Sequence, residues 1–128
     1  MASLDALLLC DSATRDAQSG KWTLGGIFDV VWVARFPAVH EALDVYFRMR
    51  AVGASPVRLS CRAPGGATIV SVPVPMTASA GAVDGSVRVV ALPLDAPGAY
   101  VFELYAGDTL LGSTTLTASQ LRDGATVH

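Results

Sequence analysis

The most specific structural signal in the chain is the segment Leu94-Asp95-Ala96-Pro97-Gly98-Ala99-Tyr100-Val101-Phe102. Pro97 fixes its own φ and Gly98 tolerates backbone conformations that other residues avoid, so this pair predicts a turn. The aromatic run after the turn is typical of a β-strand with one buried face. We expect Tyr100 to be buried, with Phe102 and Leu104 following it on the inward face of that strand.

This segment resembles the tyrosine corner of immunoglobulin-like and fibronectin-like sandwiches. In those folds a tyrosine at the start of the penultimate strand hydrogen-bonds to the backbone just upstream. The resemblance implies structural roles for Pro97, Gly98 and Tyr100. Antibody domains carry a cysteine two positions after the tyrosine, and this chain has Phe102 there, so an antibody-type domain is not expected.

Length and composition indicate one folded domain. The chain has 128 residues, of which 52% are hydrophobic and 16% charged, which is too apolar for an intrinsically disordered protein. The net charge is -2 and Lys21 is the only lysine, so nucleic-acid binding is not expected. We expect residues 1–117 to form a single domain and residues 118–128 to form a partly frayed tail.

Alternation of apolar and polar residues recurs throughout, and no window sustains helical spacing over three turns. The sequence therefore predicts an all-β protein, an eight-stranded antiparallel immunoglobulin-like β-sandwich with a tyrosine-corner-like turn. The expected strands cover residues 4–10, 22–33, 43–52, 57–63, 68–74, 86–92, 99–106 and 109–117. Gly25 and Gly26 fall inside an unusually long segment and indicate a bulge or bend there.

The corner also suggests which strands share a sheet. Chain order would place 43–52, 99–106 and 109–117 in one sheet, and 4–10, 22–33 and 86–92 in the other. Glu103 would then lie beside Arg48 and Arg50, and we expect it to form a salt bridge with one of them.

One group of polar side chains could form a binding surface if residues 57–63 pair with 43–52. It contains an aromatic residue and a row of arginines, namely Tyr46, Arg48, Arg50, Arg58 and Arg62, with Arg88 nearby. Guanidinium groups pair bidentately with carboxylates, and an aromatic ring offers a stacking surface, so this row could bind an acidic protein partner. The alternative is an ordinary solvated sheet face, which alternation predicts anyway.

No catalytic constellation is visible. His40 and His128 are the only histidines, and His40 is expected to be a solvated imidazole in a loop. We therefore expect a non-enzymatic protein-interaction or assembly module without a cofactor, and a homo-oligomer is compatible with this interpretation. The alternative is a calcium- or small-ligand-binding sandwich that uses the loop aspartates Asp11, Asp16 and Asp84.

Compartment signals point to the cytoplasm. The first residues lack the basic front of a secretory signal, and Asp29 interrupts the longest apolar stretch, residues 27–34, so neither secretion nor membrane insertion is expected. Cys10 and Cys61 fall in apolar strand patterns and are expected to be buried free thiols. A disulfide between facing sheets is the alternative.

Several short motifs occur together along the chain: Cys10-Asp11, Gly20-Lys21, Gly25-Gly26-Ile27-Phe28, Phe36-Pro37 and Pro97-Gly98-Ala99-Tyr100-Val101-Phe102. Taken together they resemble an uncharacterised bacterial family of small all-β proteins. The resemblance implies a bacterial cytoplasmic origin and an autonomous domain. This family has no established activity to carry over, so the resemblance implies no residue role.

Overall fold

Segments in which apolar and polar residues alternate form β-strands in the computed structural model. The structure describes residues 2–50, 53, 55–75 and 81–121. The described residues form nine strands and no helix. The strands are β1 (Ser3–Arg15), β2 (Trp22–Ile27), β3 (Val30–Val33), β4 (Ala38–Arg50), β5 (Val57–Arg62), β6 (Thr68–Val74), β7 (Ala82–Leu94), β8 (Gly98–Ala106) and β9 (Thr109–Gln120). Consequently none of the described residues belongs to a helix long and apolar enough to cross a membrane.

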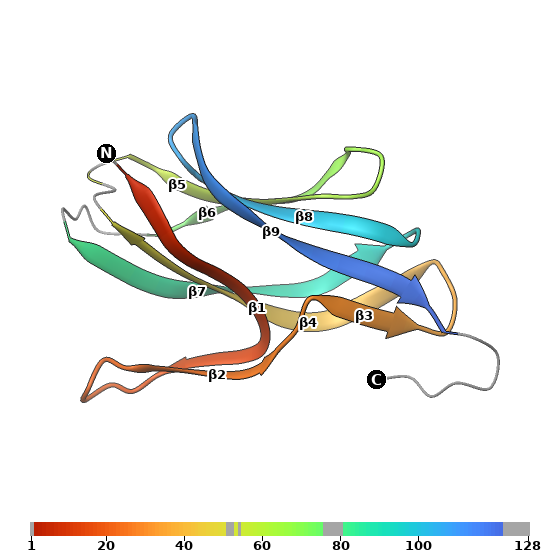
Figure 1. Cartoon of the computed structure of the whole chain (residues 1–128), viewed down its shortest axis with the longest axis horizontal. Helices are drawn as coiled ribbons and strands as arrows, with labels where there is room; N and C mark the ends of the chain where they lie inside the picture. The colour runs from red at the N-terminus through yellow and green to blue at the C-terminus, as the bar shows by residue number, and fades with distance from the viewer. Residues whose placement is uncertain (1, 51–52, 54, 76–80, 122–128) are drawn as a thin grey trace.

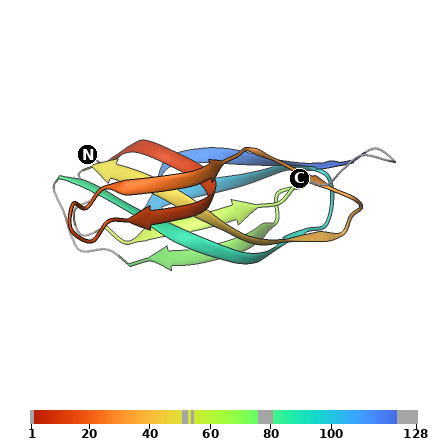
Figure 2. The same cartoon turned by 90° about the horizontal axis from the view of Figure 1, so that it is seen from below.

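The strands form two sheets that face each other as a sandwich (Figure 1; Figure 2). One sheet has four strands in the order β2-β1-β4-β7, and the other has five in the order β3-β9-β8-β5-β6. Pairing is antiparallel except between β3 and β9, which run parallel. The predicted all-β, immunoglobulin-like sandwich is confirmed.

The sandwich has nine strands rather than eight because the predicted strand 22–33 is split between the two sheets. β2 pairs with β1, and after a break at Phe28 and Asp29 the chain continues as β3 beside β9. Gly26 has a φ of +65° just before the break, which agrees with the bend predicted there.

The C-terminal ends of two predicted strands, the last and the third, need separate comment. β9 continues to Gln120, which pairs with Val33, so residues 118–120 of the predicted tail belong to a strand. Residues 122–128 of that tail, and the last predicted residues of the third strand, 51–52, lie outside the described part of the chain.

The predicted distribution of strands between the sheets is wrong for β4. This strand pairs with β1 and β7 in the four-stranded sheet, whereas β8 and β9 lie in the other. β5 pairs with β6 and β8, not with β4. Alternation identifies the buried face of a strand but not the strand beside it, so the pattern fits either sheet equally well.

The tyrosine corner is confirmed. Tyr100 is 1% exposed, and its hydroxyl donates a hydrogen bond of 2.6 Å to the carbonyl oxygen of Ala96. Gly98 provides the turn with a φ of +134°. Phe102 and Leu104 are fully buried, and they meet a core contributed from the four-stranded sheet by Leu43, Val45, Phe47 and Met49.

Candidate interaction site

The sandwich is open along one side, between β3 and the first half of β4. β1 pairs with β4 only from Ser3 to Cys10, and its remaining residues turn away to pair with β2 (Figure 1). Residues 38–43 of β4 therefore pair with β7 on one edge, and no described strand pairs with the other edge. β3 ends the five-stranded sheet, so one of its edges is also unpaired within the described chain.

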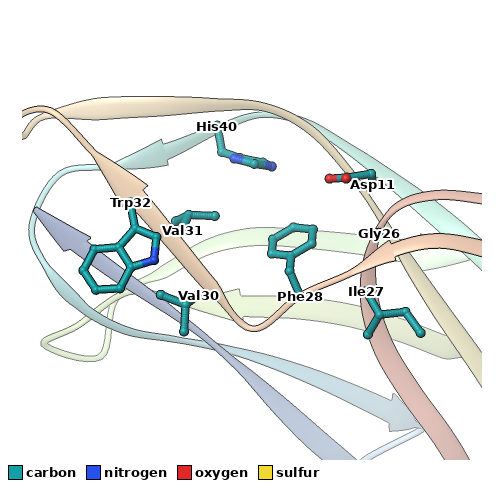
Figure 3. A pocket seen from close by; sticks show the side chains of 8 residues that line it. All are labelled: Asp11, Gly26, Ile27, Phe28, Val30, Val31, Trp32 and His40. Atoms are coloured by element: carbon teal, nitrogen blue, oxygen red, sulfur yellow. The ribbon is translucent and has the colours of Figure 1, made fainter. Parts of the chain in front are cut away.

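Two adjoining hollows of about 310 and 460 Å³ occupy this opening. They share four lining residues, Asp11, Val31, Trp32 and His40. Figure 3 shows the Asp11 carboxylate and the His40 ring directed toward the same space, which Phe28 and Val31 also border. We call the two hollows together the β3–β4 opening.

Most of the large apolar side chains that are exposed in the described chain border this opening. The described chain has six large hydrophobic residues that are exposed, and four of them line one hollow or the other. These four are Ile27, Val30, Trp32 and Val39, with exposed fractions of 60%, 36%, 42% and 60%. Apolar side chains gathered around a concave surface are typical of a binding site.

The Asp11 carboxylate fits at the opening because the residue opposite it, Gly26, has no side chain. Gly26 has no Cβ, and a Cβ built there would overlap the Asp11 carboxylate. The carboxylate therefore lies directly against the Gly26 backbone, at the point where the chain bends toward β3. The paired glycines thus bend the chain and also leave room for an acidic group.

His40 lies in β4 rather than in the loop that the sequence suggested. It pairs in register with Leu92, which is 1% exposed, so its side chain faces inward like that of Leu92. Its ring contacts the Phe28 ring at a centroid distance of 5.7 Å. The expectation was wrong because β4 begins at Ala38, where its partner is the sequence-distant end of β7.

The charged side chains that line the opening are both acidic, Asp11 and Glu41. No hydrogen bond or salt bridge to a basic side chain is seen for either carboxylate among the described residues. The opening thus combines an apolar border with two carboxylates available to a ligand.

This opening could not be identified as a site from the sequence. Its residues come from β1, the β2–β3 segment and β4, which are brought together only by the change of sheet. One signal was present: residues 30–33 are Val-Val-Trp-Val, apolar on both faces of the strand. A strand of that kind at the end of a sheet leaves an apolar face uncovered, here Val30 and Trp32.

The predicted arginine row is divided between the two sheets. Tyr46, Arg48 and Arg50 belong to β4 in the four-stranded sheet, and Arg58 and Arg62 belong to β5 in the five-stranded sheet. The expected salt bridge from Glu103 to Arg48 or Arg50 is therefore wrong. Glu103 instead pairs with Arg62, with Nε 2.7 Å from Oε1.

Carboxylates already accompany the arginines of β4. Arg50 Nε lies 2.6 Å from Asp5 Oδ2, and Arg48 Nη1 lies 3.5 Å from Asp84 Oδ2. Tyr46 donates its hydroxyl proton to the same Asp84 oxygen at 3.2 Å. Burial, followed by the charge of Asp84, raises the pKa of Tyr46 above its usual value. This face is close to charge balance, which reduces its attraction for an acidic partner.

Two further arginines have partners of different kinds. Arg88 Nη1 lies 3.0 Å from Asp44 Oδ1. Arg58 Nη1 donates to Ser71 Oγ at 2.8 Å, so its partner is a neutral hydroxyl. No single flat partner can contact the arginines of β4 and β5 together, because they lie on different sheets.

The three aspartates of the calcium alternative are separated in the structure. Asp16 accepts backbone N–H bonds from Gln18 at 2.8 Å and Ser19 at 3.0 Å, and these bonds lower its pKa. Asp84 accepts bonds from Tyr46 and Arg48, while Asp11 lies at the β3–β4 opening. Within the described ranges, no three His, Cys, Asp or Glu side chains are grouped to hold a metal ion.

Cys10 and Cys61 are free and fully buried, as predicted. Cys10 Sγ donates to the carbonyl oxygen of Asp44 at 3.5 Å. Burial raises the pKa of both thiols, and that of Cys61 reaches about 12. Both are therefore protonated at neutral pH, which makes them poor nucleophiles.

Comparison with known proteins identifies a family and a similar solved structure but no activity. An immunoglobulin-like protein from Pseudomonas aeruginosa, known from its crystal structure, shares 12% sequence identity and a TM-score of 0.49 with this chain. The match covers 92% of this chain and 96% of that one. No curated protein matches the sequence. A family model matches residues 5–119, and the chain therefore belongs to a family of unknown function (DUF6941).

Proposed function

We propose that the protein is a non-enzymatic interaction module that binds an extended segment of a protein partner in the β3–β4 opening. The segment pairs with residues 38–43 of β4, along the edge that is unpaired beyond the end of the β1–β4 pairing at Cys10. The observation that carries the proposal is that an unpaired strand edge is bordered by four exposed apolar side chains.

Strand addition is the binding mode that this geometry supports best. An unpaired edge offers N–H and C=O groups to an incoming strand, and neighbouring side chains then select its sequence. Trp32 and Val39 are placed for this role, because both are exposed and both line the same hollow. The backbone of β4 supplies affinity, while the apolar border supplies specificity.

One further observation supports a binding role rather than catalysis, and another supports a reducing compartment. The ring neighbour of His40 is Phe28, and no hydrogen bond from a Ser, Thr or Cys side chain to His40 is present among the described residues. Free thiols at Cys10 and Cys61 fit the cytoplasm, where disulfides are rare.

A peptide selection tests the proposal. Random-sequence peptides displayed on phage are selected against the wild-type protein, and the selected peptides are titrated by NMR and calorimetry. We expect amide shifts in residues 30–33 and 38–43. Trp32→Ala should weaken binding about 10-fold or more, and N-methylation of alternate peptide amides should abolish it.

Leu110→Ser is the matched control, because Leu110 is 47% exposed but lies at the β8–β9 turn. Thermal unfolding of each variant shows whether it is folded. The proposal is overturned if selected peptides bind with undiminished affinity to folded Trp32→Ala and Val39→Ser variants. It is also overturned if light scattering shows that a second copy of the chain fills the opening in a dimer that both variants disperse.

A further inference from the structure

We propose that two copies of the chain associate through the free edge of β7, by antiparallel pairing of residues 82–90 about a two-fold axis at Ser86. The two four-stranded sheets then form one continuous sheet across the dimer. This edge lies on the far side of β4 from the β3–β4 opening, so the inference is independent of the proposed function.

β7 has the longest unpaired edge among the described strands. It has thirteen residues, ends the four-stranded sheet and pairs with β4 alone, in one constant register. The other strands that end a sheet, β2, β3 and β6, have six, four and seven residues, and β6 contains Pro73. In β7 the features that hinder further pairing, a φ of +53° at Ala91 and the missing N–H of Pro93, both follow residues 82–90. Those residues can therefore accept another strand.

The outer face of this edge carries two charges of opposite sign, Asp84 and Arg88. In an antiparallel pair centred on Ser86, Asp84 of each copy lies opposite Arg88 of the other, so the symmetry makes the contact twice. Side chains directly opposite each other have Cβ atoms about 4.5–5.5 Å apart, which allows an ion pair. A pair centred on Asp84 or on Arg88 places like charges opposite each other instead. The charges therefore favour the register centred on Ser86 and a second copy as the partner.

Both charged groups can make this contact while keeping their bonds within the chain. The side chain of Arg88 is 57% exposed, and its Nη1 lies 3.0 Å from Asp44 Oδ1. A guanidinium group has five N–H donors, so Arg88 can also reach a second carboxylate. The bonds that Asp84 accepts from Tyr46 and Arg48 both go to Oδ2. Its Oδ1 can therefore accept a bond from Arg88 of the second copy.

The inner face of the same edge fits this register as well. Val83 and Val87 are half-buried, whereas Val89 is 6% exposed. Pairing about Ser86 places Val83 opposite Val89 of the second copy, and Val87 opposite Gly85. Apolar cross-strand pairs of this kind stabilise a sheet, and the new strand covers the exposed parts of both half-buried valines.

Cysteine cross-linking tests the contact. Ser86→Cys places two thiols opposite each other at the axis, within the Cα separation of about 4.4–6.8 Å that a disulfide spans. We expect a covalent dimer when about 1 mM protein is mildly oxidised. Val90→Cys is the control, because Val90 is 65% exposed but lies about 26 Å from its own copy in this register. Equal cross-linking of the two variants, or none of either, overturns the proposal.

Exchange of charges tests the register. Arg88→Glu and Asp84→Arg each place like charges opposite each other in a symmetric dimer, and each should weaken association about 10-fold or more. A mixture of the two variants restores both opposite-charge contacts, so sedimentation equilibrium should show a mixed dimer tighter than either variant forms alone. Asp108→Arg, at the β8–β9 turn, is the control and should associate like the wild type. A mixture no tighter than its components refutes this register.

Further outcomes separate this dimer from the proposed function. Thermal unfolding shows whether each variant is folded, and where a charge variant is not, the result with Ser86→Cys decides. Trp32→Ala and Val39→Ser alter the β3–β4 opening and should leave the dimer intact. A dimer that these two variants disperse, or a wild-type protein that stays monomeric up to about 1 mM, overturns pairing through β7. Loss of peptide binding in the same variants with the dimer intact supports both proposals.

Discussion

Glu103 and Arg62 form an ion pair on the five-stranded sheet, with Glu103 almost buried and Arg62 partly exposed. The side chain of Glu103 is 8% exposed, and two guanidinium nitrogens of Arg62 contact its two oxygens at 2.7 and 3.4 Å. Glu103 in turn raises the pKa of Arg62 above its usual value. A carboxylate that is so little hydrated depends on its partner.

Removal of Arg62 should therefore destabilise the protein more than removal of a comparable exposed arginine. Arg62→Gln leaves the Glu103 carboxylate buried without its cation, whereas Arg58→Gln removes only a bond to the Ser71 hydroxyl. We expect a lower midpoint of urea unfolding for Arg62→Gln than for Arg58→Gln, and a near-wild-type midpoint for the latter. Equal midpoints would show that the ion pair does not contribute to stability.

The hydroxyl of Tyr100 should contribute to stability through two hydrogen bonds to the Ala96 backbone: it donates to the carbonyl oxygen at 2.6 Å and accepts from the N–H at 3.3 Å. Tyr100→Phe keeps the buried ring but removes both bonds, and we expect a loss of about 1–2 kcal/mol in the free energy of unfolding. Tyr105→Phe, on the same strand but only half-buried, should cost less than about 0.5 kcal/mol. Chemical denaturation measures both, and equal losses would contradict a special role for the corner.

Local features of the fold could be predicted from the sequence, whereas its long-range features could not. Pro97, Gly98 and Tyr100 act within a few residues of one another, so their turn is readable as a segment. The neighbours of β4 are β1 and β7, and the residues paired with β4 lie 34–47 positions away in β1 and 32–56 positions away in β7. The ion-pair partner predicted for Glu103 was wrong for the same reason, because it depended on which strand lies beside β8.

The candidate site was missed because it arises where a strand changes sheets. The two glycines at 25 and 26 predicted a bend, but a bend does not say that the chain then crosses to the other layer. That crossing leaves β3 and the first half of β4 as unpaired edges facing one opening. His40 was assigned to a loop because the start of β4 is set by pairing with Leu92 and Leu94.

The thiol of Cys61 should make stability depend on pH in the alkaline range. Burial, with a smaller effect of Glu103, raises its folded-state pKa from 9.0 to about 12. Above about pH 9 the unfolded chain therefore loses this proton while the folded chain keeps it, and the stabilisation is lost as pH rises from about 9 toward 12. The contribution is fully present below that range.

Comparison with a variant isolates this effect from other groups, including Tyr46. Cys61→Ala has no thiol to titrate, so the difference in unfolding free energy between wild type and Cys61→Ala should shrink between neutral pH and about pH 11. Urea denaturation at a series of pH values measures the difference. A constant difference would mean that the thiol ionises with the same pKa in the folded and unfolded chains.

Gly26 should be more sensitive to substitution than other glycines with the same backbone conformation. Gly26 has a φ of +65° and Gly107 a φ of +59°, so alanine at either position carries a similar backbone strain of about 1–2 kcal/mol. Only at Gly26, of these two, does the added Cβ overlap the Asp11 carboxylate; nothing lies within 4 Å of the Cβ position at Gly107. We therefore expect a larger loss of unfolding free energy for Gly26→Ala than for Gly107→Ala.

Most of the excess loss should disappear when Asp11 is shortened, because the closest overlaps are with its carboxylate and only the Asp11 Cβ, 3.1 Å away, remains in alanine. Relative to Asp11→Ala alone, the double variant Asp11→Ala/Gly26→Ala should lose only slightly more stability than Gly107→Ala loses relative to wild type. Urea denaturation of the five proteins completes this cycle. If the loss at Gly26 stays much larger without the carboxylate, the cause is the backbone at the start of the crossing to β3. Asp11 would then not be held in place by its contact with Gly26.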